Sequence, residues 1–236
     1  MPLAKHRTPT PQAHPPPART PVAEATGATA GPGQWRVERH PSGAVLYQPT
    51  DEVHGLYLVK QGRVRLLRQT HSGARALVSL VGPGETFGEA TVGAGAIGEM
   101  AIANTDVEVW SLEATHLAAF CALDATGPLD LIAGMNARMR QMRRRLVGFT
   151  AKEVPARLSD TLLALGERHG EPCTHGGEVD LRQITQQDLA DLVGASRSFV
   201  STLINEMKRD GSLGSVGRVL CLRDLKALRK AALREA

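Results

Sequence analysis

The stretch ITQQDLADLVGASRSFVSTLINEMKRDGSL, residues 184–213, contains two short helical patterns with a single glycine between them. Thr185 followed three residues later by Asp188 is a signature of a helix N-terminus, because each side chain can bond a free backbone N–H group there. Ser196 is a second capping residue, and Gly194 stands where a tight turn needs a residue that adopts positive φ. The segment therefore predicts two capped helices joined by a short turn.

Each predicted helix has one apolar face, spaced three or four residues apart as a buried helix face requires. These faces consist of Leu189, Leu192 and Val193 in the first helix and Val200, Leu203, Ile204 and Met207 in the second. The opposite face of the second helix carries Arg197, Ser198, Ser201, Thr202 and Asn205. Short polar side chains let a helix lie close to base edges, and Arg can pair with guanine through two hydrogen bonds. The pattern predicts a DNA-binding helix-turn-helix, and an ordinary helical hairpin with a solvated polar face is the alternative.

The excess positive charge of the chain lies at its C-terminal end. Residues 182–236 carry ten Lys/Arg and six Asp/Glu, whereas residues 1–181 carry eighteen of each. The motif itself has three basic and four acidic residues, so phosphate contacts must come partly from elsewhere. Residues 217–222 predict a β-hairpin wing with Arg218 near its tip, followed by a basic final helix. We predict DNA contacts from Thr185, Gln186, Ser196, Arg197, Ser198, Ser201, Thr202, Lys208 and Arg218.

The N-terminal half differs in composition and in the spacing of its apolar residues. Residues 1–34 hold eight of the fourteen prolines and too few large apolar side chains for a core, which predicts a disordered tail. From residue 35 to about 116, short runs rich in Val, Leu and Tyr alternate with Gly and Pro turns, which predicts a β-sandwich or barrel. The runs expected to form strands are 44–47, 55–60, 63–68, 75–81 and 107–112.

A long helix is predicted over residues 128–150. Its apolar residues form one narrow stripe over about three heptads, as in a coiled-coil seam. An amphipathic helix lying on its own domain would produce the same stripe, but the narrow width favours a partner helix and hence a dimer. The stripe consists of Leu129, Ile132, Met135, Met139, Met142, Leu146 and Phe149.

Cysteine usage and hydropathy exclude several classes of protein. The three cysteines, Cys121, Cys173 and Cys221, are far apart and suggest no disulfide framework. Cys173 and His175 form a lone C-x-H in a Gly-rich loop, which is too weak a pattern to predict a metal site. No apolar stretch approaches the length of about 18 residues that spans a bilayer, and no secretory signal is recognisable. The expectation is a cytoplasmic protein with no metal, no cofactor and no membrane partner.

The motifs together resemble the CRP/FNR family of transcription regulators. The resemblance covers about residues 35–228 and rests on residues 82–89 (GPGETFGE), residues 154–158 (VPARL) and the helix-turn-helix. It implies an α+β fold with a cyclic-nucleotide-binding-like β-roll over residues 35–126, a dimerisation helix over 127–152 and a winged helix-turn-helix over 153–236. It also implies a homodimer on a palindromic operator in double-stranded DNA, with RNA polymerase as a further partner.

The chain departs from the members of this family that bind cyclic AMP. Those members place an Arg-Ser pair, which grips the cyclic phosphate, shortly after the Phe-Gly-Glu segment; here the aligned residues are Ile97 and Gly98. Where they carry a Thr-Ser pair against the adenine, this chain has Met142 and Arg143. The residues aligned with the effector pocket are Phe87, Gly88, Glu89, Ile97, Gly98, Met142 and Arg143. These departures imply a regulator that acts without cyclic AMP. The recognition helix also differs from the family, because Ser198 and Thr202 stand where many members carry Glu and Arg. The protein is therefore expected to recognise a different DNA half-site.

Two alternatives remain open at the level of sequence. The first is a ligand-gated regulator of the same family whose pocket fits another small molecule or cyclic nucleotide. The second is a β-roll metal enzyme, which would need clustered His ligands and a carboxylate. His40, His54 and His71 stand singly, so the sequence favours no catalytic residues and no enzyme.

Overall fold

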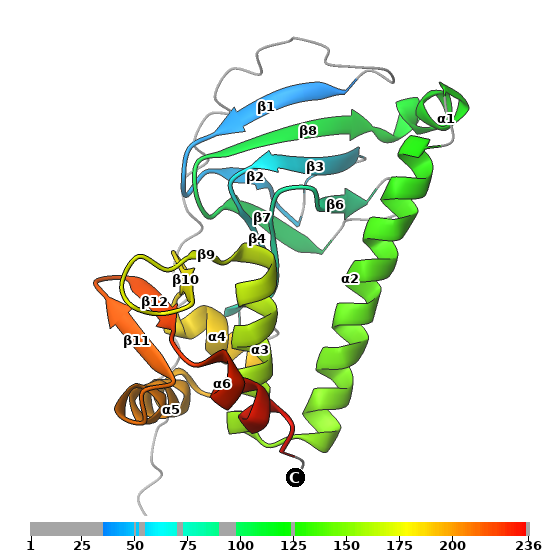
Figure 1. Ribbon diagram of the computed structural model, residues 1–236. Helices are drawn as coiled ribbons and strands as arrows, with labels where there is room; N and C mark the ends of the chain where they lie inside the picture. Colours follow the sequence, from blue (N-terminus) through cyan, green and yellow to red (C-terminus); the bar gives the residue numbers. More distant parts are fainter. Residues whose placement is uncertain are drawn as a thin grey trace, which may run out of the picture.

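The computed structural model describes residues 35–49, 51, 55–69, 73–89, 98–123 and 126–234. The N-terminal tail predicted to be disordered lies outside these residues, as do Ile97, His54 and His71. A β-rich domain and a smaller α+β domain lie beside a long helix, α2 (Thr126–Ala151), that runs along both (Figure 1). Among the described helices, none combines the length and the hydropathy that a membrane span requires.

The N-terminal domain is a β-roll of two antiparallel four-stranded sheets, in the orders β1-β8-β3-β6 and β2-β7-β4-β5. The strands are β1 (Arg36–His40), β2 (Val45–Tyr47), β3 (Gly55–Gln61), β4 (Val64–Gln69), β5 (Arg75–Val81), β6 (Thr86–Glu89), β7 (Glu99–Ala103) and β8 (Val107–Glu113). The five strands predicted from the sequence are confirmed. Three further strands were not predicted. Strand β1 has the sequence RVERH, which contains few apolar residues, and β6 has the sequence TFGE, which is interrupted by a glycine. Strand β7 directly follows a Gly/Ala run, which gives no strand signal.

The core of the β-roll is filled by three aromatic rings among aliphatic side chains. Tyr57 and Phe87 stack with ring centroids 5.0 Å apart, and Tyr47 lies 6.2 Å from Phe87. Phe87 is 1% exposed, so it serves as a core residue of the roll. Gly88 has φ +87°, and a Cβ there would stand 2.6 Å from the Gly55 carbonyl oxygen, so the strand pair β3–β6 needs glycine at this point.

Helix α1 (Ala114–Leu123) leads from β8 into α2 and was not predicted. Its sequence, ATHLAAFCAL, is apolar nearly all round and has no helical stripe, so periodicity gave no signal. Phe120 of α1 meets Trp35 edge to face at 5.6 Å, which attaches the helix to the start of the roll.

The C-terminal domain surrounds its own apolar core. Its elements are α3 (Val154–His169), β9 (Glu171–Pro172), β10 (Val179–Leu181), α4 (Gln186–Val193), α5 (Arg197–Arg209), β11 (Leu213–Val216), β12 (Val219–Leu222) and α6 (Leu225–Ala232). The strands form one antiparallel sheet in the order β11-β12-β10-β9. Leu158, Leu162 and Leu222 are fully buried between the helices and this sheet. The β-roll, long helix and winged domain together confirm the predicted fold class.

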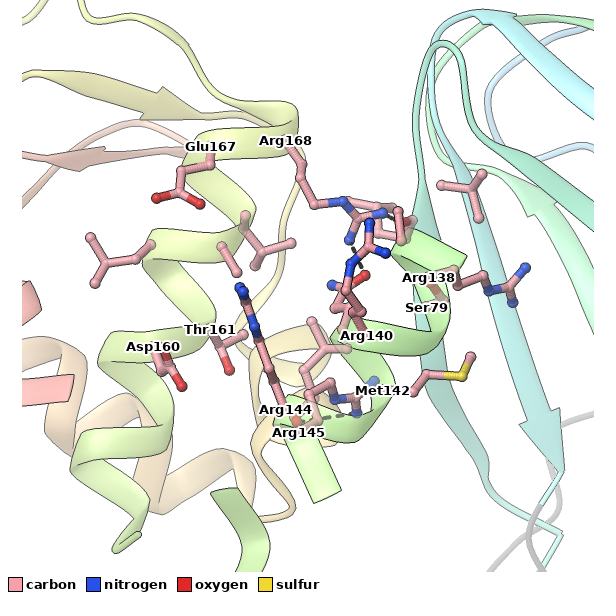
Figure 2. A pocket seen from close by; sticks show the side chains of 18 of the residues that line it. Ser79, Arg138, Arg140, Met142, Arg144, Arg145, Asp160, Thr161, Glu167 and Arg168 are labelled. Atoms are coloured by element: carbon pink, nitrogen blue, oxygen red, sulfur yellow. Dashed lines mark hydrogen bonds between the residues drawn. The ribbon is translucent and has the colours of Figure 1, made fainter. Parts of the chain in front are cut away.

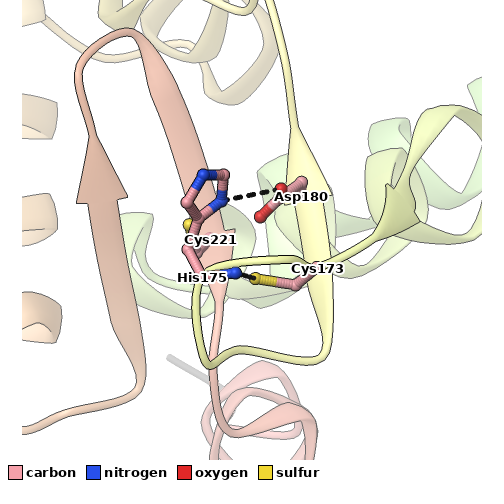
Figure 3. A group of neighbouring side chains, drawn as sticks. All are labelled: Cys173, His175, Asp180 and Cys221. Carbon is pink, nitrogen blue, oxygen red and sulfur yellow. Dashed lines mark hydrogen bonds and ion pairs between the residues drawn. The ribbon is translucent and has the colours of Figure 1, made fainter.

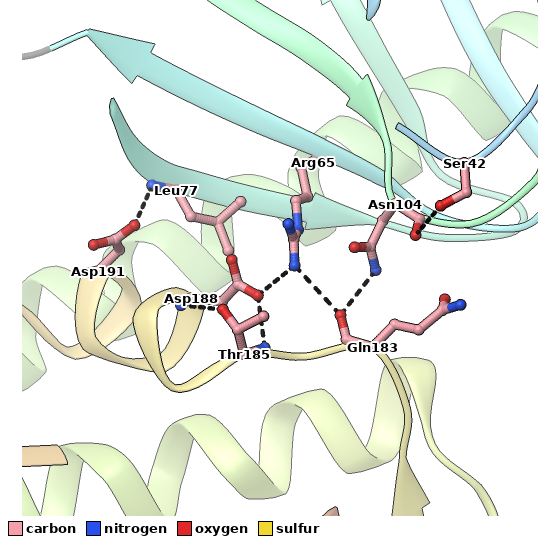
Figure 4. A network of polar contacts seen from close by, with 8 residues as sticks. All are labelled: Ser42, Arg65, Leu77, Asn104, Gln183, Thr185, Asp188 and Asp191. Carbon is pink, nitrogen blue, oxygen red and sulfur yellow. Dashed lines mark hydrogen bonds and ion pairs between the residues drawn. The ribbon is translucent and has the colours of Figure 1, made fainter. Parts of the chain in front are cut away.

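The two domains are docked through polar contacts as well as apolar ones (Figure 4). Leu77 and Leu80 of β5 belong to the C-terminal core. Arg65 of β4 forms an ion pair with Asp188 of α4 at 2.6 Å, and the Leu77 backbone N–H donates to Asp191 at 2.9 Å. Burial, and then the charge of the adjacent Arg168, lower the pKa of His169 to about 4, so this ring at the same junction is neutral near pH 7.

Candidate nucleic-acid interface

The first helix of the helix-turn-helix, α4, begins with the predicted capping box. The Asp188 backbone N–H donates to Thr185 Oγ1 at 3.1 Å, and the Thr185 N–H donates to Asp188 Oδ2 at 2.7 Å. Gly194 ends the helix in the left-handed region with φ 65°, as predicted. A Cβ at this position would lie 2.7 Å from the Phe149 ring, so a side chain here would also collide with α2.

The second helix, α5, begins at the predicted cap and buries the predicted face. Ser196 Oγ accepts a hydrogen bond from the Phe199 N–H at 3.2 Å. The side chains of Val200, Leu203, Ile204 and Met207 are all buried in the domain core. The sequence interpretation of the two helices is therefore confirmed residue by residue, and α5 presents its remaining face outward.

The outward face of α5 is open and polar. Arg197, Ser198 and Thr202 are exposed, and Ser201 is half-buried. The Thr202 hydroxyl donates to the Ser198 carbonyl at 3.2 Å, which holds that side chain against its own helix. Among the residues that the structure describes, none takes a hydrogen bond or ion pair from the Arg197 side chain, so its guanidinium is free for an external partner.

The wing lies beside this face. Strands β11 and β12 form a hairpin whose turn carries Gly217 at φ +57° and the exposed Arg218. Thr185 is exposed, and Gln186 and Lys208 are half-buried. The residues predicted to contact DNA are thus all accessible on α4, α5 and the hairpin.

The sequence alone assigns no role to Phe199, an accessible aromatic residue on α5. Phe199 is 44% exposed although it is a large apolar side chain. It stands one residue before the buried Val200, so its place outside the apolar spacing was the available signal. An exposed ring in the first turn of α5 suits contact with a thymine methyl group.

Replacing Thr185 with Ala is expected to lower the free energy of unfolding by about 1 kcal/mol, because α4 loses the acceptor for one of its free N–H groups. Denaturant unfolding measures this difference. Thr202→Ala is the matched control, because its hydroxyl bonds only a carbonyl within α5. Equal losses in the two variants would show that the capping box does not stabilise α4.

A cleft of about 600 Å³ lies between β5, α2 and α3. Figure 2 shows Arg140, Arg144 and Arg168 pointing into it, whereas Arg138 points away. Of the residues predicted for an effector pocket, Met142 lines this cleft, whereas Phe87 belongs to the β-roll core. Arg143 donates to Met139 Sδ at 3.1 Å on the exposed side of α2. The arginines that line the cleft include Arg138, Arg140, Arg144, Arg145 and Arg168.

The remaining predicted effector residues lie on the β-roll. Gly88 and Glu89 are in β6, paired with the start of β3. Gly98 precedes β7, and a Cβ there would lie 3.3 Å from the Arg68 guanidinium. The predicted set is therefore divided between the roll and the α2 cleft.

Helix α2 contacts its own chain through two of its arginines, Arg138 and Arg145, while its apolar stripe is largely exposed. Arg145 donates to the carbonyl oxygens of Val78 at 2.7 Å and Leu192 at 3.2 Å, and so connects α2 to both domains. Arg138 donates to the Thr86 carbonyl at 3.4 Å. The stripe residues Leu129, Ile132, Met135, Met139, Met142, Leu146 and Phe149 are between 42% and 66% exposed. Phe149 also lies under the Arg157 guanidinium, 5.3 Å from its ring centroid.

Comparison with known proteins agrees with this architecture. The model of the cyclic nucleotide-binding domain matches residues 37–124, and that of the Crp-like helix-turn-helix domain matches residues 156–231. A cyclic AMP receptor protein of Thermus thermophilus is 31% identical over 176 residues, 73% of this chain and 76% of that protein. A CRP-like cAMP-activated global transcriptional regulator of Mycobacterium tuberculosis is 26% identical over 194 residues, 81% of this chain and 86% of that protein.

Solved structures show the same fold. A CRP/FNR-family transcriptional regulator of Thermus thermophilus has a TM-score of 0.69 at 27% identity, covering 85% of this chain and all of that one (100%). The matched domains and the named relatives are regulatory, so the β-roll enzyme considered from the sequence is excluded. The chain therefore belongs to the CRP/FNR family of DNA-binding transcription regulators.

Proposed function

We propose that this protein binds a palindromic operator as a homodimer and does so without cyclic AMP. The observation that carries the proposal is the exposure of two surfaces, the α2 stripe and the outer face of α5. The first is suited to a second copy of the chain and the second to a DNA groove. RNA polymerase is the further partner expected of such a regulator, and the cytoplasm is its expected location.

The α2 stripe supports the homodimer. A helix lying on its own domain would bury these residues, yet all of them are at least 42% exposed. A contiguous apolar strip of this length is uncommon on the surface of a monomer, because it is unfavourable in water. A second α2 offers the same stripe, and a twofold axis along the pair would bring both into one seam.

A twofold dimer determines the kind of operator. Two recognition helices related by a twofold axis read two inverted half-sites, with centres about 34–36 Å apart, or one helical turn of DNA. Arg197 and the short side chains of α5 would meet base edges, while Lys208 and Arg218 would meet phosphates. Mapping the bound genomic sites would give the operator and test its symmetry.

Independence from cyclic AMP is supported by how the arginines near the roll are used. Arg63 donates to the His169 carbonyl at 3.1 Å, and Arg65 pairs with Asp188 in the C-terminal domain. These two cations therefore join the domains, and their guanidinium groups are engaged by protein groups. The same contacts dock the helix-turn-helix domain on the roll through protein groups alone.

Added cyclic AMP is expected to leave operator binding nearly unchanged. A ligand shifts a conformational equilibrium only by its difference in affinity for the two states, and both family contacts for that ligand are replaced here. The measurement is a titration of labelled operator with and without millimolar cyclic AMP, with nanomolar binding expected in both. A tenfold tightening, about 1.4 kcal/mol of coupling, would contradict this part of the proposal.

A ligand-gated regulator is the second candidate, and the arginine-lined cleft favours it. The exposed guanidinium groups of Arg140 and Arg144 suit an anionic small molecule, which would bridge α2 and α3. Three other cleft arginines already bond protein groups: Arg138, Arg145 and Arg168. Isothermal titration with phosphate-bearing metabolites, repeated on Arg144→Ala, distinguishes the two candidates. Saturable binding that is lost in the variant and tightens operator binding would establish gating through the cleft.

A further inference from the structure

Four metal-ligating side chains meet at the two central strands of the C-terminal sheet, β10 and β12, and at the loop that precedes β10 (Figure 3). Cys173, His175, Asp180 and Cys221 each offer one ligand atom, and these atoms all lie within 4.8 Å of one another. Cys173 and His175 alone were too weak a pattern to predict a metal. The fold adds a carboxylate and a second thiol to them.

Strand pairing brings the four residues together. Asp180 of β10 is directly opposite Cys221 of β12 in the antiparallel register. The loop from Cys173 to Glu178 is held over this pair, because the Glu178 N–H donates to the Leu222 carbonyl at 2.7 Å. Gly177 permits the close approach, since a Cβ there would stand 3.1 Å from Cys173 Sγ.

Two features of the cluster point to a cation. Cys173 Sγ accepts the backbone N–H groups of His175 at 3.3 Å and Gly177 at 3.2 Å, which is the arrangement of a sulfur that carries negative charge. Asp180 is fully buried, and its Oδ2 lies 3.1 Å from His175 Nδ1. Its other neighbours are the thiols of Cys173 and Cys221, which are weak donors and leave Oδ1 without a well-formed hydrogen bond within the described residues. A buried carboxylate oxygen that only weak donors approach is unfavourable unless a stronger partner satisfies it.

We propose that this cluster binds one Zn²⁺ ion per chain through the sulfurs of Cys173 and Cys221, the His175 ring and the Asp180 carboxylate. Four protein ligands form a closed structural site, which leaves no position for substrate. Zinc bonds of about 2.0–2.3 Å place tetrahedral ligand atoms about 3.3–3.8 Å apart, so small side-chain movements suffice. Thiolate ligands select zinc over magnesium and calcium.

The surroundings fit such an ion. Two thiolates and one carboxylate around a divalent cation leave one net negative charge, and Arg182 Nη2 lies 3.9 Å from Asp180 Oδ2 to offset it. The ion would join the β9–β10 loop to β12, which is the second strand of the wing. Its role would be to stabilise the sheet from which Arg218 approaches DNA.

The test measures metal in the purified full-length protein, reduced and dialysed after exposure to zinc. Wild type and Cys121→Ser, whose cysteine is exposed on α1 outside the cluster, are expected to hold one zinc per chain by mass spectrometry. Cys173→Ser and Asp180→Asn are expected to lose at least tenfold in zinc affinity. Zinc should raise the thermal midpoint of wild type and Cys121→Ser, and it should leave that of Cys173→Ser unchanged.

Cobalt gives a readout that does not depend on DNA binding or on the fold of any variant. Co²⁺ added to reduced wild-type protein should produce thiolate charge-transfer absorption, which zinc then abolishes. Folded, reduced wild-type protein that takes up no zinc and shows no such absorption would overturn the proposal. A Cys173–Cys221 disulfide that persists as the native form would overturn it as well.

Discussion

A Met139→Glu variant is expected to be a monomer at concentrations where the wild type is a dimer. Met139 lies in the middle of the exposed α2 stripe, so the substitution leaves the core of each chain untouched. In the dimer, two new carboxylates would enter an apolar seam near the twofold axis. An unpaired buried charge costs several kcal/mol, and each 1.4 kcal/mol raises the dissociation constant tenfold.

Light scattering and sedimentation measure the loss directly, and we expect the dimer dissociation constant to rise at least a hundredfold. Ala133→Glu is the matched control, because it adds the same charge at an exposed position of α2 outside the stripe. The control should remain dimeric. Specific DNA binding should fall with Met139→Glu, because a monomer contacts one half-site. A fully dimeric Met139→Glu protein would show that the seam lies elsewhere.

The parts of the fold that were predictable depend on local chemistry. Thr185, Gly194 and Ser196 mark helix ends because capping and positive φ act over three or four residues, and all three marks are confirmed. Helix α1 was missed for the opposite reason: a helix apolar nearly all round gives no periodic signal. Strand β6 was missed because Gly88, which the close β3–β6 approach requires, lowers strand propensity.

Contacts between distant residues could not be derived from the sequence. Asp188 was identified as a cap, but its ion pair with Arg65 depends on how the two domains dock. Cys221 is more than forty residues from Cys173, and the β10–β12 register alone brings it to the cluster. The apolar stripe of α2 follows from its sequence spacing, whereas the hydrogen bonds by which Arg145 connects the helix to both domains do not.

An Arg197→Ala variant is expected to lose most of the preference for operator over random DNA. Arg197 is the first residue of α5, and the N-terminus of a recognition helix is the part that enters the major groove. A lost bidentate contact costs about 1–3 kcal/mol per half-site, which becomes about 2–6 kcal/mol in a dimer that reads two. The substitution should not lower the free energy of unfolding, because a cation is unfavourable near the positive end of a helix dipole.

Titrations of operator and random DNA over a range of salt concentrations separate base contact from phosphate contact. Lys226→Ala is the control, because Lys226 is exposed on α6 and is expected to meet the backbone. It should weaken both DNAs alike and reduce the salt slope by about one for each lost contact, or about two per dimer. Arg197→Ala should instead weaken the operator at least thirtyfold and random DNA far less. Equal losses on both DNAs would place Arg197 on the phosphates and leave base readout to the serines, Thr202 and Phe199 of the same helix.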